Sequence, residues 1–310
     1  MNLIELMLQE LPFTEHELVL LIATAPARYK VHHIEKRNGR GLREIAQPTA
    51  EVKLLQRWAI TRVLNNLPVH SAASAYVKGK SIKDHAAAHA GSRYLLKLDF
   101  QNFFPSIRSV DFIKHAAIHT KLSLQDVENL SRILFRRQRG ERTLRLSIGA
   151  PSSPFVSNSI MFSFDEHIQR HCDAKGIAYT RYADDLAFST NTPHILDDLL
   201  SFVQATCSRI DHPKLTLNSE KTVFASKKHS RQLTGITLTN DGLLSIGRQR
   251  KREIRAMTHR ASLGQLTFDE INHLKGLISF VYSVEPEFIQ TLKRMVGEEK
   301  MHFLFPISKK

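Results

Sequence analysis

The sequence predicts an α+β protein, in which an antiparallel sheet and helices follow one another along the chain. Two observations support this prediction. Alternating apolar runs at 94–100 and 179–188 are typical of strands, and each contains aspartate where the apolar alternation stops. Apolar residues recur at helical spacing over residues 3–25 and again after Gly247. The chain shows no internal repeat, low-complexity tract or long linker.

The first part of the chain is predicted to contain helices and one hairpin. Helical spacing covers 3–25, and Thr14 with Glu17 forms the pattern of a capping box. The following elements are two strand-like runs and the turn between them: 31–34, 42–45 and Asn38-Gly39-Arg40-Gly41. A core helix is then expected to begin at Pro48-Thr49 and to carry an apolar stripe as far as Val63.

The rest of the chain is predicted to alternate between helices and short strands. The prolines of Pro151-Ser152-Ser153-Pro154 stand where a helix begins, since a missing N–H costs least there. The predicted elements are a helix at 81–90, helices within 110–138, a long helix at 155–168, the hairpin around 179–188, a helix at 194–210, strands at 233–238 and 243–246 around an Asn240-Asp241-Gly242 turn, and helices near 248–262, 268–283 and 286–297.

Composition limits the class of protein. The 310 residues are 42% apolar and 24% charged, as in globular proteins. The sequence has no apolar run of the length, roughly 18 residues, that a membrane span requires, and its start lacks the basic-then-apolar order of a signal peptide. The two cysteines, Cys172 and Cys207, have no metal-ligand spacing. We therefore expect a cytoplasmic protein without disulfides and without a membrane partner.

The net charge of +14, from 44 Lys+Arg against 30 Asp+Glu, predicts a polyanionic partner. Nucleic acid is the first candidate and a membrane surface the second; a generally basic soluble protein is the alternative. Six arginines fall between Arg132 and Arg145, opposed there by Glu141 alone. A second basic cluster comprises Arg248, Arg250, Lys251, Arg252, Arg255 and Arg260. Clusters of this kind favour binding to a phosphate backbone.

Three aspartates stand at predicted strand ends. Asp184 and Asp185 occupy a tight turn, for which solvation alone is one interpretation. Asp99 ends another strand pattern and favours the second interpretation, a metal site. Two divalent ions about 4 Å apart, held by carboxylates, are the usual device for phosphoryl or nucleotidyl transfer.

These motifs in this order resemble a reverse transcriptase, and more narrowly the bacterial retron type. The motifs are Asp99, Pro151-Ser152-Ser153-Pro154, Ala183-Asp184-Asp185 and Asn218-Ser219-Glu220-Lys221, and the resemblance covers roughly residues 40 to 285. It implies a right-hand fold with fingers, a palm of antiparallel sheet and helices, and a small helical thumb. The implied ranges are fingers at 1–93, palm at 94–110, a fingers insertion at 111–148, palm again at 149–244 and thumb at 245–310.

The resemblance assigns a catalytic role to four side chains. Asp99 and Asp184 would bridge two Mg²⁺ ions, with Mn²⁺ as a substitute, and Asp185 would be a weaker ligand. The backbone carbonyl of Phe100 would also coordinate. Lys221 would assist departure of pyrophosphate, although a surface lysine is the alternative.

The resemblance also implies a nucleotide pocket for dNTPs. Phe104 would be an aromatic gate against ribonucleotides, or else a core aromatic. Tyr182 would touch the primer end, or else pack within the hairpin. Arg43 and Lys53 would grip the triphosphate; either could equally face solvent.

One loop departs from the family pattern within this pocket. Gly149, Ala150 and Pro151 would shape the nucleotide and template site, because small residues permit a close backbone approach. Many relatives carry glutamine before the glycine, whereas this chain has Ile148. The usual side-chain contact to the nucleotide is therefore in doubt.

Two stretches favour the retron branch. His85-Ala86-Ala87-Ala88-His89 stands where retron enzymes carry Asn-Ala-x-x-His, and Leu233-Thr234-Gly235 where they carry Val-Thr-Gly. The resemblance makes both regions, and the basic thumb helix, contacts for RNA; the alternatives are internal hydrogen bonds and a solvated basic face. The implied RNA-binding residues are His85, His89, Thr234, Gly235, Arg250 and Arg255.

The function implied by the resemblance is that of a retron reverse transcriptase. Such an enzyme binds its own noncoding RNA, primes from an internal guanosine 2′-hydroxyl and makes single-stranded DNA joined to the RNA by a branch. A host RNase H and a separate effector protein in anti-phage defence are the implied partners. Two alternatives remain at this point: a reverse transcriptase of the intron, diversity-generating or abortive-infection class, and a catalytically silent RNA-binding protein.

Overall fold

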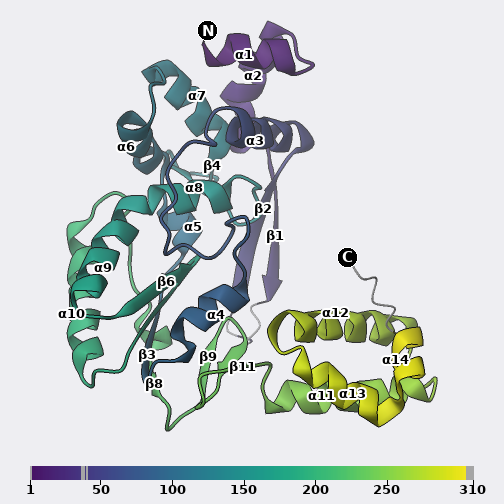
Figure 1. Ribbon diagram of the computed structural model, residues 1–310. Helices are drawn as coiled ribbons and strands as arrows, with labels where there is room; N and C mark the ends of the chain where they lie inside the picture. The colour runs from purple at the N-terminus through teal and green to yellow at the C-terminus, as the bar shows by residue number, and fades with distance from the viewer. Residues whose placement is uncertain (1, 36–38, 40, 305–310) are drawn as a thin grey trace.

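A four-stranded antiparallel sheet lies at the centre of the molecule, in the strand order β6-β7-β3-β8 (Figure 1). The computed structural model that shows it describes residues 2–35, 39 and 41–304. The strands are β3 (Tyr94–Asp99), β6 (Ala178–Tyr182), β7 (Asp185–Thr190) and β8 (Val223–Ser226). The hairpin predicted around 179–188 is thereby confirmed.

The two faces of this sheet differ, because successive side chains of a strand point to opposite sides. Leu98 and Leu186 lie in the main hydrophobic core, together with residues of the helices that cover this face. Asp99 and Asp185 point to the other face, toward which α4 packs. The helices of the two faces are α4 (Ile82–Ala90), α8 (Ser153–Ile160), α9 (Phe162–Ala174) and α10 (Ile195–Arg209).

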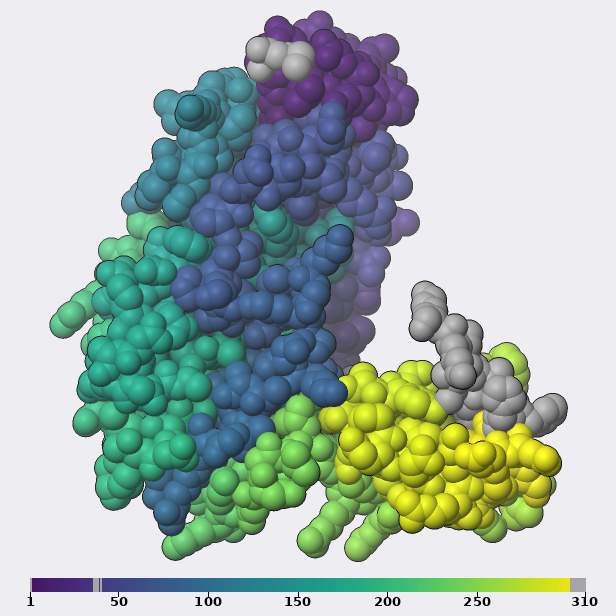
Figure 2. All heavy atoms as spheres, viewed as in Figure 1, coloured from purple at the N-terminus to yellow at the C-terminus, as the bar shows by residue number. Residues whose placement is uncertain are grey.

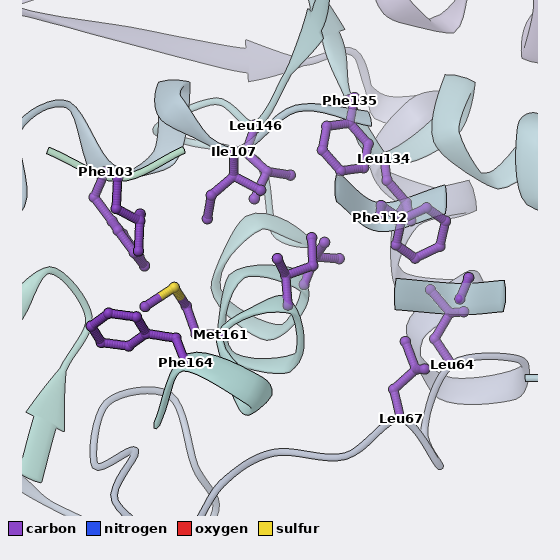
Figure 3. Packing of buried hydrophobic residues seen from close by; sticks show 14 of the residues in the cluster. Leu64, Leu67, Phe103, Ile107, Phe112, Leu134, Phe135, Leu146, Met161 and Phe164 are labelled. Carbon is purple, nitrogen blue, oxygen red and sulfur yellow. The ribbon is translucent and has the colours of Figure 1, made fainter. Parts of the chain in front are cut away.

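The main core continues from the sheet into the N-terminal helices. Phe112 packs against Phe135 with ring centroids 5.9 Å apart, and Phe103, Met161 and Phe164 lie in the same core (Figure 3). Each fully buried side chain of this size stabilises the fold by about 1.5–3 kcal/mol. The elements of this part are α1 (Leu3–Glu10), α2 (Glu15–Thr24), η1 (Ala25–Ala27), α3 (Ala50–Arg62), α5 (Phe103–Ser106), α6 (Ser109–His119), α7 (Leu124–Leu134), β4 (Arg136–Arg137) and β5 (Leu144–Arg145).

A long antiparallel hairpin leaves the N-terminal helices and extends past the sheet (Figure 1). Its strands are β1 (Tyr29–Glu35) and β2 (Leu42–Pro48), as the sequence predicted. The predicted turn falls on Asn38 and Arg40, which lie outside the described residues. The Thr14–Glu17 capping box is confirmed at the start of α2.

The C-terminal part has a hydrophobic core of its own. In the space-filling view its helices form a lobe beside the rest of the molecule (Figure 2). This core joins the helices to a three-stranded sheet and to α4 through residues such as Ala86, Ile236 and Leu274. The elements are η2 (Ser219–Lys221), β9 (Arg231–Leu233), β10 (Ile236–Leu238), β11 (Leu244–Ser245), α11 (Arg248–Ser262), α12 (Phe268–Val284), α13 (Glu287–Val296) and α14 (Glu298–Leu304).

Two predicted elements are wrong in detail. The helix predicted at 155–168 is two helices, α8 and α9, because the ψ of Met161 is −4° and interrupts the helical geometry. The strand predicted at 233–238 is two strands, β9 and β10, around a two-residue turn at Thr234 and Gly235 with φ of +48° and +82°. Within the described ranges, no helix is long and apolar enough to cross a membrane.

Candidate active site

The hairpin between β6 and β7 places two carboxylates at its tip. Tyr182 pairs with Asp185, so Ala183 and Asp184 are the two residues of the turn. The φ of Ala183 is +57°, and positive φ at this position is what a tight two-residue hairpin requires. The turn therefore projects Asp184 from the end of the sheet.

Asp99 meets this turn from the neighbouring strand. It stands directly opposite Asp185 in the β3–β7 register, and the next N–H, that of Phe100, donates to the carbonyl oxygen of Asp184 at 3.1 Å. Side chains directly opposite on adjacent strands lie within about 5.5 Å of each other at Cβ. The predicted convergence of the three aspartates is thus present in the structure.

The three carboxylates raise one another's proton affinity. Burial, followed by the charges of Asp184 and Asp99, raises the pKa of Asp185 to about 6. Burial and the charge of Asp99 also raise the pKa of Asp184 above its usual range. A site of this kind holds negative charge that a cation would stabilise.

Lys221 supplies a cation to one of the three. Its ammonium group donates to both carboxylate oxygens of Asp99, at 2.9 and 2.8 Å. The Lys221 side chain is 55% exposed, whereas that of Asp99 is 7% exposed. The lysine therefore approaches Asp99 from solvent and is free to turn toward a phosphate group.

The donor set fits a hard divalent cation in its chemistry. Across residues 2–35, 39 and 41–304, no group of three or more His, Cys, Asp or Glu side chains is already arranged as a metal site. However, three facing carboxylates repel one another, and the directly opposed pair of Asp99 and Asp185 is a destabilising like-charge pair. Carboxylate oxygens are the ligands that Mg²⁺ prefers.

This repulsion predicts a pH-dependent stability in metal-free protein. The folded Asp185 has a pKa of about 6 and the unfolded one an ordinary value of 3.8. Between these values the folded state binds more protons, so the free energy of unfolding falls as pH rises through this window. Asp185→Asn should therefore be more stable than the parent protein above the window, by about 2–3 kcal/mol, and no more stable below it. Urea unfolding in the presence of a chelator measures this; a constant difference at all pH values would contradict it.

A buried ion pair holds the turn from the core side of the sheet. Arg181 and Asp165 are fully buried, and the Arg181 guanidinium donates to the Asp165 carboxylate at 2.6 to 3.1 Å. The same guanidinium donates to the carbonyl oxygen of Ala183 and to Oδ1 of Asn158, both at 3.1 Å. Tyr179 donates its hydroxyl to Asp165 at 2.7 Å.

The sequence analysis missed this ion pair, although two signals for it exist. Arg181 occupies the same strand face as the apolar Tyr179, and Asp165 interrupts an apolar helical stretch. A charged side chain at a core-facing position is seldom found without a partner. The ion pair fixes the backbone of the catalytic turn.

Two histidines hold the hairpin from its other face. His85 Nδ1 and His89 Nε2 both hydrogen-bond Thr180 Oγ1 at 2.7 Å, and His89 Nδ1 hydrogen-bonds Ser189 Oγ at 2.8 Å. Both histidines are fully buried. Burial and the charge of Lys97 lower the pKa of His85 to about 4, and burial and His85 lower that of His89 to about 3. The prediction that these side chains contact RNA conflicts with their burial; they are neutral side chains that join α4 to the hairpin.

Comparison with known proteins identifies the family. Residues 34–238 match the sequence profile of a family described as reverse transcriptase (RNA-dependent DNA polymerase). The chain belongs to this family. Retron Ec83 reverse transcriptase of Escherichia coli is 44% identical over 90% of this chain and 90% of its own length. Retron Ec86 reverse transcriptase, also of Escherichia coli, is 32% identical over 94% of this chain and 87% of its own length. The protein is thus a retron-type reverse transcriptase, an RNA-directed DNA polymerase.

Solved structures confirm the right-hand polymerase fold. Telomerase of Candida albicans, solved with a fragment of telomeric RNA, matches with a TM-score of 0.50 over 91% of this chain and 61% of that chain, at 11% identity. Apo telomerase of Candida tropicalis matches with a TM-score of 0.50 over 89% of this chain and 60% of that chain, at 10% identity. At such identities the likeness concerns the fold alone.

The nucleotide-pocket loop of this reverse transcriptase packs on the long hairpin. A Cβ on Gly149, whose φ is +112°, would lie 3.1 Å from the carbonyl oxygen of Ala46 in β2. The N–H of Ala46 donates to the carbonyl oxygen of Ile148 at 2.8 Å. Ala150 is buried and Pro151 is partly buried. Glycine is therefore required here by both conformation and space.

The two cations predicted to grip the triphosphate differ in position. Arg43 is exposed on β2, and its charge lowers the pKa of Asp184, so it faces the catalytic turn of the reverse transcriptase. Lys53 is partly buried on α3. Arg43 is thus the better placed of the two for a substrate phosphate.

Aromatic side chains flank the acids. Phe104 is partly buried on α5, with its ring 5.4 Å from that of Phe103. The ring of Tyr182 lies 5.7 Å from that of His85 and 6.5 Å from that of Tyr76. Tyr76 was not predicted, because a tyrosine in a loop carries no signal of its own.

The predicted RNA contacts of the C-terminal part lie around a basic groove. Arg250 donates to the carbonyl oxygen of Gly235 at 3.1 Å and stacks on Phe280 at 4.9 Å, whereas Arg255 stacks on Phe288 at 5.1 Å and is exposed. A groove of about 1000 Å³ runs beside them. The basic residues that line it are Lys227, Lys228, His229, Arg248, Arg250 and Lys251.

Proposed function

We propose that this reverse transcriptase copies a cognate structured noncoding RNA into single-stranded DNA in a Mg²⁺-dependent reaction. Priming from an internal guanosine 2′-hydroxyl would leave the DNA joined to the RNA by a branch. The observation that carries the proposal is the convergence of Asp99, Asp184 and Asp185 at one end of the sheet, beside Lys221. The similarity to retron reverse transcriptases supports the retron form of the reaction.

The chain's own residues have distinct tasks in this reaction. Asp99, Asp184 and Asp185 would hold two divalent ions, which supply activation of the primer hydroxyl and neutralisation of the leaving pyrophosphate. Arg43 would bind the triphosphate from β2. Lys221 would turn from Asp99 to the pyrophosphate as its charge develops, because its side chain reaches the site from solvent.

The polymerase parts are proposed from the same architecture. We assign the palm to the central sheet with its helices, the fingers to the N-terminal helices and the β1–β2 hairpin, and the thumb to α11–α14. The fully buried Arg181–Asp165 ion pair keeps the catalytic turn of the palm in place. Positioning of this kind supplies much of the catalysis in phosphoryl transfer.

Phe104 is proposed as the gate against ribonucleotides. It follows Asp99 by five positions, on the helix that begins just after β3. Phe104→Ala should increase acceptance of ribonucleotides relative to deoxynucleotides by about 10–200-fold, the range that a lost side-chain contact of this size produces. The ratio of kcat/KM for dGTP and GTP measures it, with Phe104→Tyr as the ring-retaining control. An unchanged ratio would remove the assignment.

The basic groove beside α11 is proposed as an RNA-binding surface. Six basic side chains line it, and Glu253 is the acidic residue among its lining. Thr234 and Gly235 stand at a turn beside this groove, and Arg255 is exposed on the same helix as Arg250. Binding through these groups should weaken steeply with salt, because each phosphate contact releases counterions.

Action in the cytoplasm, with a host RNase H and a separate effector protein in defence against phage, completes the proposal. It rests on the similarity to retron enzymes. Reverse transcriptases of the intron or diversity-generating class are the alternative.

Analysis of RNA that co-purifies with the protein tests the proposal. A DNA strand that an enzyme specific for 2′–5′ branches releases from the RNA would support it. DNA synthesis with ordinary 3′-primed products alone would exclude the retron form. A protein that binds RNA but makes no DNA would overturn the polymerase assignment.

A further inference from the structure

Tyr76 is an exposed aromatic residue at the end of a buried loop. The four residues before it, 72–75, are buried, whereas 54% of Tyr76 is accessible to solvent. Its φ is +60°, a region that bulky side chains seldom adopt. Backbone strain of this kind persists only where surrounding contacts fix the residue, and such residues cluster at ligand-binding sites.

The loop is fixed by the residues that hold the catalytic turn. The N–H of Ser74 donates to the carbonyl oxygen of Arg181, and the N–H of Arg181 donates to that of Ala72, both at 2.8 Å. Asn158 Nδ2 donates to the carbonyl oxygen of Ala75 at 2.7 Å. Arg181 and Asn158 are the same side chains that hydrogen-bond each other behind Asp184. The position of Tyr76 is therefore linked to that of the catalytic turn.

The ring of Tyr76 extends the aromatic surface beside the acids. Its centroid lies 6.5 Å from that of Tyr182, at an interplanar angle of 36°. Internal packing does not account for this arrangement, because more than half of the residue stays in water. The exposed Lys78 follows two positions later, so an aromatic and a cationic side chain stand together at the surface. Such a combination is typical of surfaces that bind single nucleotides of a strand.

We propose that Tyr76 stacks on the nucleobase at the primer end and, with Tyr182, positions that nucleotide beside Asp184. The inference rests on the proposed placement of the primer end at Tyr182. A stacking contact suits this task because every nucleobase has a π-face. The contact therefore accepts a primer end of any sequence, as a polymerase must at each cycle.

A fluorescent base analogue at the primer end tests the proposal. A primer ending in 2-aminopurine, annealed to an RNA template, is bound to the protein without dNTPs. Stacking on Tyr76 should change the 2-aminopurine emission, and this change should be lost in Tyr76→Ala and retained in Tyr76→Phe. The kcat/KM for the primer should fall about tenfold in Tyr76→Ala, with the KM for dNTP unchanged. Phe268→Ala, at an exposed aromatic on α12, is the control.

Further variants separate stacking from folding and from the polymerase activity. Tyr76→Leu keeps apolar bulk without a π-face, so a parental emission change in this variant, or in Tyr76→Ala, would overturn the proposal. If Tyr76→Ala melts at a lower temperature, the comparison of Leu with Phe decides. The fluorescence experiment uses no dNTPs. Failure of the parent protein to make DNA would therefore overturn the proposed function and leave the stacking test valid.

Discussion

Asp184→Asn is expected to abolish DNA synthesis while the protein remains folded and bound to nucleic acid. The side chain stands at the tip of a two-residue turn, and its charge is destabilised by burial and by Asp99. Loss of the carboxylate therefore removes a metal ligand without removing a stabilising contact. Metal ions contribute several kcal/mol of transition-state stabilisation, and such a loss reduces the rate by at least about a thousandfold. Single-turnover primer extension measures the rate, and filter binding measures the affinity for RNA.

A matched variant shows whether the position matters. Asp198→Asn makes the same change at an exposed aspartate on α10, which covers the other face of the sheet. This control should extend primers at the parental rate. Equal synthesis by Asp184→Asn and by the parent would contradict the assignment of the metal site. A joint loss of RNA binding and synthesis would assign Asp184 to structure instead.

Arg181→Met and Asp165→Asn are each expected to lower the free energy of unfolding by about 3–5 kcal/mol, because each leaves an unpaired charge or an unpaired donor in the core. Both side chains are fully buried in the parent protein. Arg181→Met also removes the hydrogen bond to the carbonyl oxygen of Ala183. Urea denaturation measures the change, and primer extension should decline as the catalytic turn loses this support.

The double variant distinguishes this explanation from a loss of packing. Arg181→Met combined with Asp165→Leu replaces two charges with apolar groups, which is often neutral or stabilising in a buried site. The double variant should therefore be more stable than either Arg181→Met or Asp165→Asn. Additive losses would indicate that packing, rather than an unpaired charge, accounts for the effect. Single variants as stable as the parent would contradict the account.

The sequence predicted the elements that local patterns specify. Alternation of apolar residues identified β6 and β7, and the three aspartates at strand ends met as expected because β3 pairs with β7. The helices of the C-terminal part were predicted within a residue or so at each end, since their apolar residues recur at helical spacing.

Features that depend on tertiary contacts escaped the sequence analysis. His85 and His89 look like surface side chains in an alanine-rich helix, and their burial follows from the packing of α4 on β6 and β7. Thr234 is β-branched and favours a strand, yet it takes a positive φ in the turn between β9 and β10. The partnership of Arg181 with Asp165 joins residues from a strand and a helix, which no local pattern specifies.

Production of RNA-linked DNA in cells tests the central claim most directly. The gene would be expressed with about a kilobase of its upstream DNA, and nucleic acid extracted and treated with RNase. The account predicts a discrete short DNA that requires the upstream DNA and is absent in the Asp184→Asn/Asp185→Asn double variant. Absence of this product, with primer extension on a generic RNA template intact, would contradict retron synthesis and leave a reverse transcriptase of another class.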